Sequence, residues 1–375
     1  MAAGRGIGPR ARPEPAPVRT SEAAAARHAL GEHGKVLLLG GIGIGKPDES
    51  NAVWLAKTPV LDGLFKSKLY TQLKAHGTAV GLPSDDDMGN SEVGHNAIGA
   101  GRIFDQGARL VNRALKSGEI FKTKVWEEIA RRARNGGTVH FIGLLSDGNV
   151  HSHIEQLYIL INKCAEMNFP KVKLHALLDG RDVGERTALD YVVPTEEKLR
   201  NISKQKRFDY AIASGGGRMK VTMDRYNSDW NIVKRGWDAH VRGQGRMFRS
   251  ASEAIKTFYQ EDPKATDQYL PAFVVMDSTG KPKGRIVDGD VVIFFNFRGD
   301  RAIEISRAFT EKEFTEFDRG PLPDIFYAGM MEYDGDAHIP PHFLVQPPAI
   351  DRVISEYLCA EKVKTFAVSE TQKYG

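Results

Sequence analysis

The sequence has 375 residues, 41% of them hydrophobic and 27% charged, with a formal net charge of +4 at pH 7. These values suit a soluble globular protein with room for two domains. No apolar run approaches the roughly 20 residues of a membrane span, and two cysteines, Cys164 and Cys359, are too few for a disulfide framework. We therefore expect a cytoplasmic protein in a reducing compartment that does not bind membranes.

The first 34 residues form a basic tail rich in alanine, proline and arginine. Five arginines and two glutamates within residues 1–30 account for most of the net charge. This composition cannot bury enough apolar area to fold, so we expect a disordered extension. An arginine-rich, acid-poor start also fits an organelle transit peptide, but Thr20 and Ser21 are its only hydroxyl residues.

Next comes an unusual polar stretch, DMGNSEVGHNAIGAGR at residues 87–102, in which glycines surround Ser91. One interpretation is a helix that begins with Ser91 as its N-cap. The other places Ser91 at a helix N-terminus so that its oxygen accepts a phosphoryl group, with free backbone N–H groups receiving the anion.

Short apolar runs predict strands that alternate with helical patterns, such as the one at residues 154–167. The predicted strands lie at residues 35–39, 138–144, 171–178, 208–213, 291–295 and 364–368. This alternation predicts an α/β fold with mainly parallel sheets.

Polar loops follow four of these predicted strands, at residues 145–153, 179–187, 214–226 and 296–301. Ligands of parallel sheets bind at the carboxyl ends of strands, so these loops are expected to meet. Together they contribute His151, Asp182 and the arginines Arg181, Arg218, Arg225, Arg298 and Arg301. Such a set predicts a small phosphorylated anion as ligand. Nucleic acid is not expected, because no basic helix or aromatic-basic pattern accompanies the arginines.

Several long motifs in this order resemble the cofactor-independent phosphoglycerate mutases, metal enzymes of the alkaline phosphatase superfamily. The resemblance covers residues 35–375 and rests on HGTAVGLPSDDDMGNSEVGHNAIGAGR, GLLSDGNVHSH, DGRDV, ASGGGRMKVTMDRY, NFRGDRAIEISRAF, YAGMMEYDGD and SETQKYG. It implies a doubly wound phosphatase-like domain interrupted by an inserted α/β phosphotransferase domain. The segments would be residues 1–34 (tail), 35–106 (first phosphatase-like segment), 107–341 (insert) and 342–375 (start of the second phosphatase-like segment).

The resemblance also implies a glycolytic reaction and the role of each residue. 3-Phosphoglycerate and 2-phosphoglycerate would be interconverted by a monomer through a phosphoserine at Ser91, with two Mn²⁺ or Mg²⁺ ions, one bound by Ser91. Asp182 would move the glycerate hydroxyl proton, and His151 and Arg181 would hold the glycerate. Arg218 and Arg225 would hold its carboxylate and hydroxyl region, while Arg298, Arg301 and Lys373 would grip the phosphoryl group. Closure of the insert, with hinges near Gly107 and Pro340, would bring the arginines to Ser91.

Two departures from the family pattern concern metal. Gly40 stands where the family has a metal-binding aspartate, and glycine supplies no carboxylate. The chain also ends just after the Lys373 motif, so we expect it to lack the C-terminal family segment with further aspartate and histidine ligands.

These departures predict weak or absent mutase activity in the chain as written and leave an alternative open. In that alternative the chain is a catalytically inactive phosphoglycerate-binding fragment. A metal phosphatase or phosphopentomutase of the same superfamily is disfavoured by DGRDV and NFRGDRA.

Overall fold

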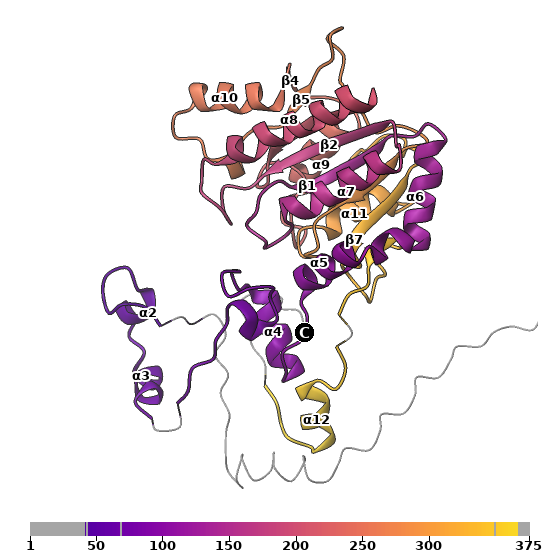
Figure 1. The fold of residues 1–375 in the computed structure, drawn as a ribbon. Coiled ribbons are helices and arrows are strands. Elements are labelled where there is room, and N and C mark those ends of the chain that lie inside the picture. The colour runs from indigo at the N-terminus through magenta and orange to yellow at the C-terminus, as the bar shows by residue number, and fades with distance from the viewer. Residues whose placement is uncertain (1–41, 43, 68–69, 349, 367–375) are drawn as a thin grey trace, which may run out of the picture. The chain divides into compact units, whose positions relative to one another are not determined.

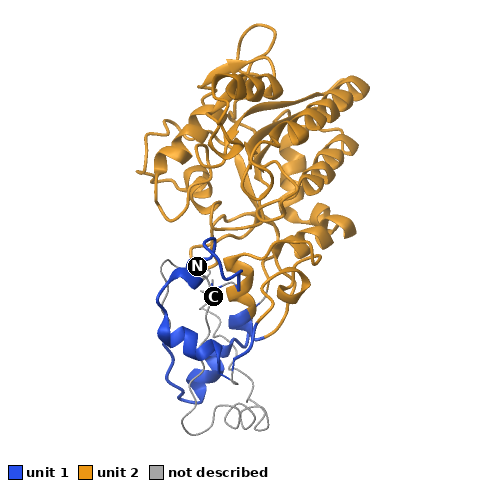
Figure 2. Ribbon diagram, turned by 90° about the vertical axis from the view of Figure 1, so that its left-hand side faces the viewer, with its two compact units in different colours: residues 1–72, 98–101, 350–375 blue, residues 73–97, 102–349 orange. Residues whose placement is uncertain are grey.

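The computed structural model describes residues 42, 44–67, 70–348 and 350–366. The basic tail, the predicted strand at residues 35–39, Gly40 and Lys373 lie outside the described residues. The chain divides into two compact units, coloured separately in Figure 2: residues 1–72, 98–101 and 350–375 form unit 1, and residues 73–97 and 102–349 form unit 2. The domain boundaries at 34, 106 and 341 remain predictions.

Unit 2 contains an eight-stranded mixed sheet in the order β4-β5-β3-β2-β1-β6-β7-β8. β5 pairs antiparallel with β3, and every other pairing of the sheet is parallel. The strands are β1 (Val139–Leu144), β2 (Lys171–Leu178), β3 (Asp209–Gly217), β4 (Arg246–Phe248), β5 (Phe273–Val275), β6 (Val291–Phe294), β7 (Phe326–Met331) and β8 (Phe343–Val345). The predicted α/β class and mainly parallel sheet are confirmed.

Helices cover both faces of this sheet (Figure 1). One layer holds α5 (Gly107–Ser117), α6 (Lys124–Arg134), α7 (Ile154–Glu166), α8 (Ala188–Lys206) and α10 (Ala251–Glu261). The other layer holds α9 (Trp230–His240) and α11 (Ile303–Thr310), which meet where the Trp237 and Phe309 rings lie 4.8 Å apart. Short 3-10 helices occur at Gly77–Val80, Glu119–Lys122 and Asp267–Tyr269.

The central strands are buried on both faces, which explains their nearly continuous apolar sequences. All six residues of β1 and all four of β6 are buried. They belong to one large core cluster that includes Trp126 of α6, Leu160 of α7 and Trp237 of α9. Because β1, β2, β3 and β6 are parallel, the polar loops that follow them lie at one edge of the sheet.

Helix starts follow local capping chemistry. Thr123, His153, Asp229 and Ser250 precede α6, α7, α9 and α10, and each side chain accepts a hydrogen bond from a first-turn N–H group. These bonds satisfy donors that a helix start otherwise leaves without partners.

Two predicted strands need correction. β3 runs to Gly217 instead of Ala213, because its glycines let it continue close to β2: a Cβ on Gly215 would lie 2.3 Å from the Ala176 carbonyl oxygen. The strand predicted at 364–368 is wrong for its described part, since residues 364–366 form no strand. No described neighbour pairs with them, and an isolated extended segment has no ladder to stabilise it.

The described part of unit 1 contains only short helices: α2 (Ala52–Leu55), α3 (Pro59–Phe65), α12 (Ile354–Ala360) and the last residues of α4 (Ser91–Ala100). None of the residues of α2, α3 and α12 is buried. Across the described residues of both units, no helix is long and apolar enough to cross a membrane.

Candidate phosphoglycerate site

Four adjacent parallel strands, β3, β2, β1 and β6, direct their C-terminal loops to the same edge of the sheet. These loops carry His151, Asp182 and five arginines, which we call the arginine cluster: Arg181, Arg218, Arg225, Arg298 and Arg301. The predicted meeting of the four loops is therefore confirmed.

Arg218 is the centre of the site and is almost completely buried, with 1% of its surface exposed. Its Nη1 donates to Asp179 Oδ1 at 2.8 Å and to Asp182 Oδ2 at 2.5 Å, and its Nη2 donates to His151 Nε2 at 2.6 Å. Arg218 thus holds three neighbouring side chains through a rigid fork.

His151 is neutral in this environment. Burial lowers its pKa well below the usual value, and the positive charges of Arg218 and Arg298 lower it further. Since Nε2 accepts from Arg218, the ring proton lies on Nδ1. His151 therefore offers one N–H donor to a ligand.

Asp300, at the end of the loop after β6, joins the remaining arginines. Its carboxylate lies 3.3 Å from Arg225 Nη1, 3.2 Å from Arg298 Nε and 3.8 Å from His151 Nδ1. A Cβ on the preceding Gly299 would lie 2.8 Å from the Tyr333 carbonyl oxygen, so this close turn requires glycine. Asp300 keeps two guanidinium groups together that would otherwise repel each other.

Arg301 is buried and donates from Nη1 to the Met223 carbonyl oxygen at 2.6 Å. Burial and the neighbouring positive charges of Arg225 and Arg218 together lower its pKa to about 10. The group remains charged at neutral pH, and a bound anion would relieve this repulsion. Arg181, by contrast, is exposed, and no hydrogen bond or ion pair joins its side chain to another described residue.

Several buried polar atoms of the site have no hydrogen-bond partner among the described residues. Two of them are Arg218 Nε and His151 Nδ1; Arg298 Nε and Asp300 Oδ1 also make no hydrogen bond, but they form an ion pair 3.2 Å apart. Buried polar groups are normally paired, so the unpaired donors of Arg218 and His151 at the strand ends fit a site that a polar ligand completes.

Ser91 is the first residue of α4 and is exposed. The helix cap is Asn90, whose Oδ1 accepts from the N–H groups of Glu92 and Val93. Ser91 is therefore not the N-cap. The second interpretation also needs correction, because two of the N–H groups expected to receive an anion are already bound by Asn90.

His95 lies one turn after Ser91, with Nδ1 3.2 Å from Ser91 Oγ and 2.6 Å from the Ser91 carbonyl oxygen. A carbonyl oxygen only accepts, so Nδ1 carries the proton and is not available as a base for the hydroxyl.

The Ser91 segment contacts the strand-end loops within unit 2. Glu92 Oε2 lies 3.3 Å from Arg298 Nε, and Asn149 donates a side-chain hydrogen bond to Asp87. Burial raises the pKa of Glu92 to about 7, partly opposed by Arg298. Ser91 is thus next in sequence to a residue that pairs with the arginine cluster.

The described residues do not fit a metal pair. They include no group of three or more His, Cys, Asp or Glu side chains placed to hold a metal ion. A divalent cation needs several oxygen or imidazole ligands, and Ser91 by itself offers one.

Sequence reasoning missed Asp179, Asp300 and Glu92. Each is a carboxylate that pairs with or organises a predicted residue. Asp179 and Asp300 lie within the DGRDV and NFRGDR motifs, next to arginines that were predicted for the site. This adjacency in sequence could have identified both aspartates.

Comparisons with known proteins agree with this geometry. A family model described as "BPG-independent PGAM N-terminus" matches residues 111–335, more than half of the chain. A "Probable 2,3-bisphosphoglycerate-independent phosphoglycerate mutase" from Leptospira interrogans serogroup Icterohaemorrhagiae serovar copenhageni is 55% identical over 343 residues, which cover 91% of this chain and 62% of that protein. The 2,3-bisphosphoglycerate-independent phosphoglycerate mutase of Trypanosoma brucei brucei is 52% identical over 342 residues, again 91% of this chain and 62% of the relative.

A solved structure is also similar. It is described as "Crystal structures of Leishmania mexicana phosphoglycerate mutase at low cobalt concentration", with a TM-score of 0.82 and 52% identity over 86% of this chain and 59% of that chain. The chain thus spans about three fifths of the length of these relatives. From the family match and these identities, the chain belongs to the BPG-independent phosphoglycerate mutase (PGAM) N-terminus family.

Proposed function

We propose that this chain provides the substrate-holding part of a phosphoglycerate mutase that interconverts 3-phosphoglycerate and 2-phosphoglycerate through a phosphoserine at Ser91. The observation that carries the proposal is the meeting of the arginine cluster with His151 and Asp182 at the ends of four adjacent strands. Guanidinium groups match both the carboxylate and the phosphoryl group of such a ligand.

The mutase reaction requires the glycerate to be held while a phosphoryl group leaves one oxygen and joins another. Arg225 and Arg298 are fixed by Asp300, and Arg301 is fixed by the Met223 carbonyl oxygen, so their remaining N–H donors are preorganised for an anion. Positioning and charge neutralisation supply most of the rate in phosphoryl transfer.

Asp182 is proposed to accept and return the proton of the glycerate hydroxyl. Arg218 holds its carboxylate by a short hydrogen bond, and the Asp182 N–H donates to Asp179 Oδ1 at 3.0 Å. These contacts orient the carboxylate that would serve as the base. The neutral His151 would donate from Nδ1 to a glycerate oxygen.

Ser91 is proposed as the phosphoryl acceptor. Because Asn90 occupies two N–H groups of the helix start, Arg298 and Arg301, with Lys373, would neutralise most of the phosphoryl charge. The resemblance assigns two Mn²⁺ or Mg²⁺ ions to this chemistry, and the described residues supply only Ser91 toward them. We therefore derive no step through a metal. The cytoplasmic location and monomeric state likewise remain predictions.

A second candidate function is phosphoglycerate binding without turnover. It is favoured by Gly40, which has no carboxylate where the resemblance expects a metal-binding aspartate.

An enolase-coupled mutase assay, with added Mn²⁺ and with EDTA, separates the two candidates, together with titration calorimetry using 3-phosphoglycerate. Turnover that is lost in Ser91→Ala while calorimetric binding persists supports the mutase. Binding without turnover, in Mn²⁺ and in EDTA, supports the second candidate. Absence of calorimetric binding contradicts both.

A further inference from the structure

A continuous chain of hydrogen bonds crosses the interior of unit 2, away from the arginine cluster. We call it the buried histidine chain, and its members in order are Asp290, His140, His175, Ser214, His240 and Thr222. All six side chains are buried, five of them with no exposed surface. The successive donor–acceptor distances are 3.1, 2.9, 2.6, 2.7 and 2.9 Å.

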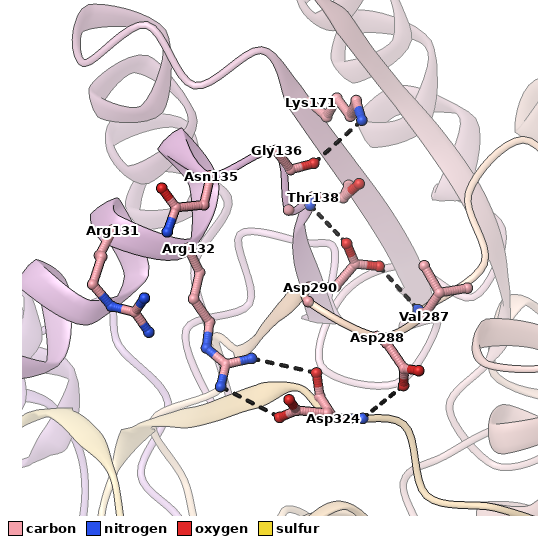
Figure 3. Close-up of a pocket in the computed structure, with 12 residues that line it drawn as sticks. Arg131, Arg132, Asn135, Gly136, Thr138, Lys171, Val287, Asp288, Asp290 and Asp324 are labelled. Atoms are coloured by element: carbon pink, nitrogen blue, oxygen red, sulfur yellow. Dashed lines mark hydrogen bonds and ion pairs between the residues drawn. The ribbon is translucent and has the colours of Figure 1, made fainter.

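The chain starts at the edge of the sheet where the parallel strands begin. Asp290 precedes β6 and lines a cavity of about 470 Å³ that also includes Arg132, Lys171 and Asp324 (Figure 3). Its carboxylate accepts from the N–H groups of Thr138 and Val287 and from His140. The hydrogen bonds, led by the one from His140, lower the pKa of Asp290 against the opposing effect of burial, so the group is an anion.

An anion at one end gives every bond of the chain a direction, because a carboxylate only accepts. His140 must donate from Nε2, so its Nδ1 accepts from His175 Nε2–H. His175 Nδ1 then accepts from the Ser214 hydroxyl, whose oxygen accepts from His240 Nδ1–H. His240 Nε2 finally accepts from the Thr222 hydroxyl. Each histidine is neutral and uses one donor and one acceptor, consistent with the lowering of all three pKa values by burial.

A β-bulge makes this path possible. Leu174 of β2 pairs with Ile212 of β3, but the next residue, His175, pairs with Ser214. The extra residue in β3 turns Ser214 to the face of the sheet on which His175 lies, because adjacent strand residues point to opposite faces. Without it, Ser214 would share the face of Leu174.

The Thr222 end of the buried histidine chain lies next to the arginine cluster. Thr222 adopts a positive φ of 70°, which is strained for a β-branched residue and persists only where the surroundings hold it. The next residue, Met223, supplies the carbonyl oxygen that binds Arg301, and Arg225 follows in the same turn.

We propose that the buried histidine chain is a positioning device that holds the turn 222–225, and through it Arg225 and Arg301, in the ligand-binding arrangement. The effect on ligand affinity rests on the proposed function. The direction of the hydrogen bonds and the hold on the turn do not.

The first test is the protonation of the three rings, read from ¹H–¹⁵N spectra of ¹⁵N-histidine-labelled protein. We expect His140 and His175 to be protonated at Nε2 and His240 at Nδ1. Protonation of His240 at Nε2 would overturn the proposal, because the Thr222 hydroxyl would then have no acceptor on that ring.

The second test compares Thr222→Val, which removes the terminal donor, with Thr222→Ser, which keeps it. Thr195→Val is the matched control: Thr195 is also fully buried, and its hydroxyl donates to the Tyr191 carbonyl oxygen on the other layer of helices. Readouts are amide hydrogen exchange in residues 222–225 and calorimetric affinity for 3-phosphoglycerate. We expect Thr222→Val to speed exchange there and to weaken binding about tenfold, the factor that matches one lost hydrogen bond. Thr222→Ser should restore both.

Equal exchange in this turn for Thr222→Val and Thr195→Val would contradict the proposal. If the unmodified protein does not bind 3-phosphoglycerate, the proposed function fails. The comparison of hydrogen exchange then still decides whether the buried histidine chain holds the turn 222–225. Should Thr222→Val not fold, Ser214→Ala interrupts the same path and is judged by the same exchange readout.

Discussion

The arginine cluster and the buried histidine chain are two polar regions of one apolar fold, and they treat charge in opposite ways. The cluster keeps several positive charges beside Asp179, Asp182 and Asp300 and leaves some buried polar atoms without partners. The buried histidine chain holds a single charge, on Asp290, and each of its side chains is hydrogen-bonded to the next. A region that binds an anion keeps some hydrogen-bonding groups unpaired for the ligand. A region that only positions the binding residues has all its hydrogen bonds formed within the protein.

The largest effect should come from Arg218→Met, which removes the centre of the cluster. The buried Asp179 and the partly buried Asp182 would then lose their cation, so we expect a loss of about 3–5 kcal/mol in the free energy of unfolding. Binding of 3-phosphoglycerate should weaken by roughly a hundredfold or more. Urea unfolding and calorimetry measure the two. Arg242→Met, at an arginine paired with Asp238 outside the cluster, is the control, and an equal loss of binding there would contradict the assignment.

The next largest effect is expected for Asp290→Asn, which neutralises the one charged group of the buried histidine chain. The amide cannot accept from all three donors, so unfolding free energy should fall by about 2–3 kcal/mol. Asp288→Asn changes an exposed carboxylate of the same cavity (Figure 3). If the two variants lose the same free energy of unfolding in urea, Asp290 does not stabilise the buried histidine chain.

The pH dependence of the free energy of unfolding also distinguishes the buried histidine chain from the arginine cluster. Burial lowers the pKa of His240 to about 3, so the folded ring stays neutral while the unfolded ring takes up a proton below about pH 6.5. The stability from this neutral ring is present above pH 6.5 and is lost as the pH falls. Each such histidine contributes about 1.4 kcal/mol per pH unit to the slope.

His240→Asn should therefore flatten the slope of unfolding free energy between pH 6 and pH 5 by about that amount. Glu92 and Glu304, whose pKa values burial raises to about 7, act with the opposite sign over this range, so only the difference between variant and parent is informative. His338→Gln, at an exposed ring, is the control. An unchanged slope in His240→Asn would show that His240 is not held neutral.

The smallest effect on stability is expected for Arg181→Ala, because this exposed side chain makes no hydrogen bond or ion pair with another described residue. Unfolding free energy should change by less than about 0.5 kcal/mol, while affinity for 3-phosphoglycerate should fall about two- to fivefold. Arg186→Ala on the same loop should do the reverse, since Arg186 donates to the Pro263 and Ala265 carbonyl oxygens. A destabilised Arg181→Ala with unchanged affinity would remove Arg181 from the site.

Much of the site was predictable from the sequence. The apolar runs at residues 138–144 and 171–178 became β1 and β2 within one residue, because strands buried on both faces need continuous apolar sequence. The polar loops that follow such runs in a parallel sheet must lie at one edge, so His151, Asp182 and Arg218 were identified together.

The strands β4, β5, β7 and β8 were not predicted. β4, β5 and β8 have three residues each, too few for a periodic signal, and their strand character comes from pairing with neighbours. The interpretation of Ser91 as the cap of α4 was wrong: Asn90 also suits that position chemically, and the backbone conformation selected Asn90.

The sequence by itself determined the fold class, the family and which loops carry the arginines, because hydrophobic patterning and motif order are local properties of the chain. The tertiary structure decided which carboxylate holds which arginine, the neutral state of His151 and the path from Asp290 to Thr222. These features join residues far apart in the sequence, such as His140 and Asp290, which are 150 positions apart. Their geometry depends on strand order, on one β-bulge and on burial, and none of these is encoded in the spacing of neighbouring residues.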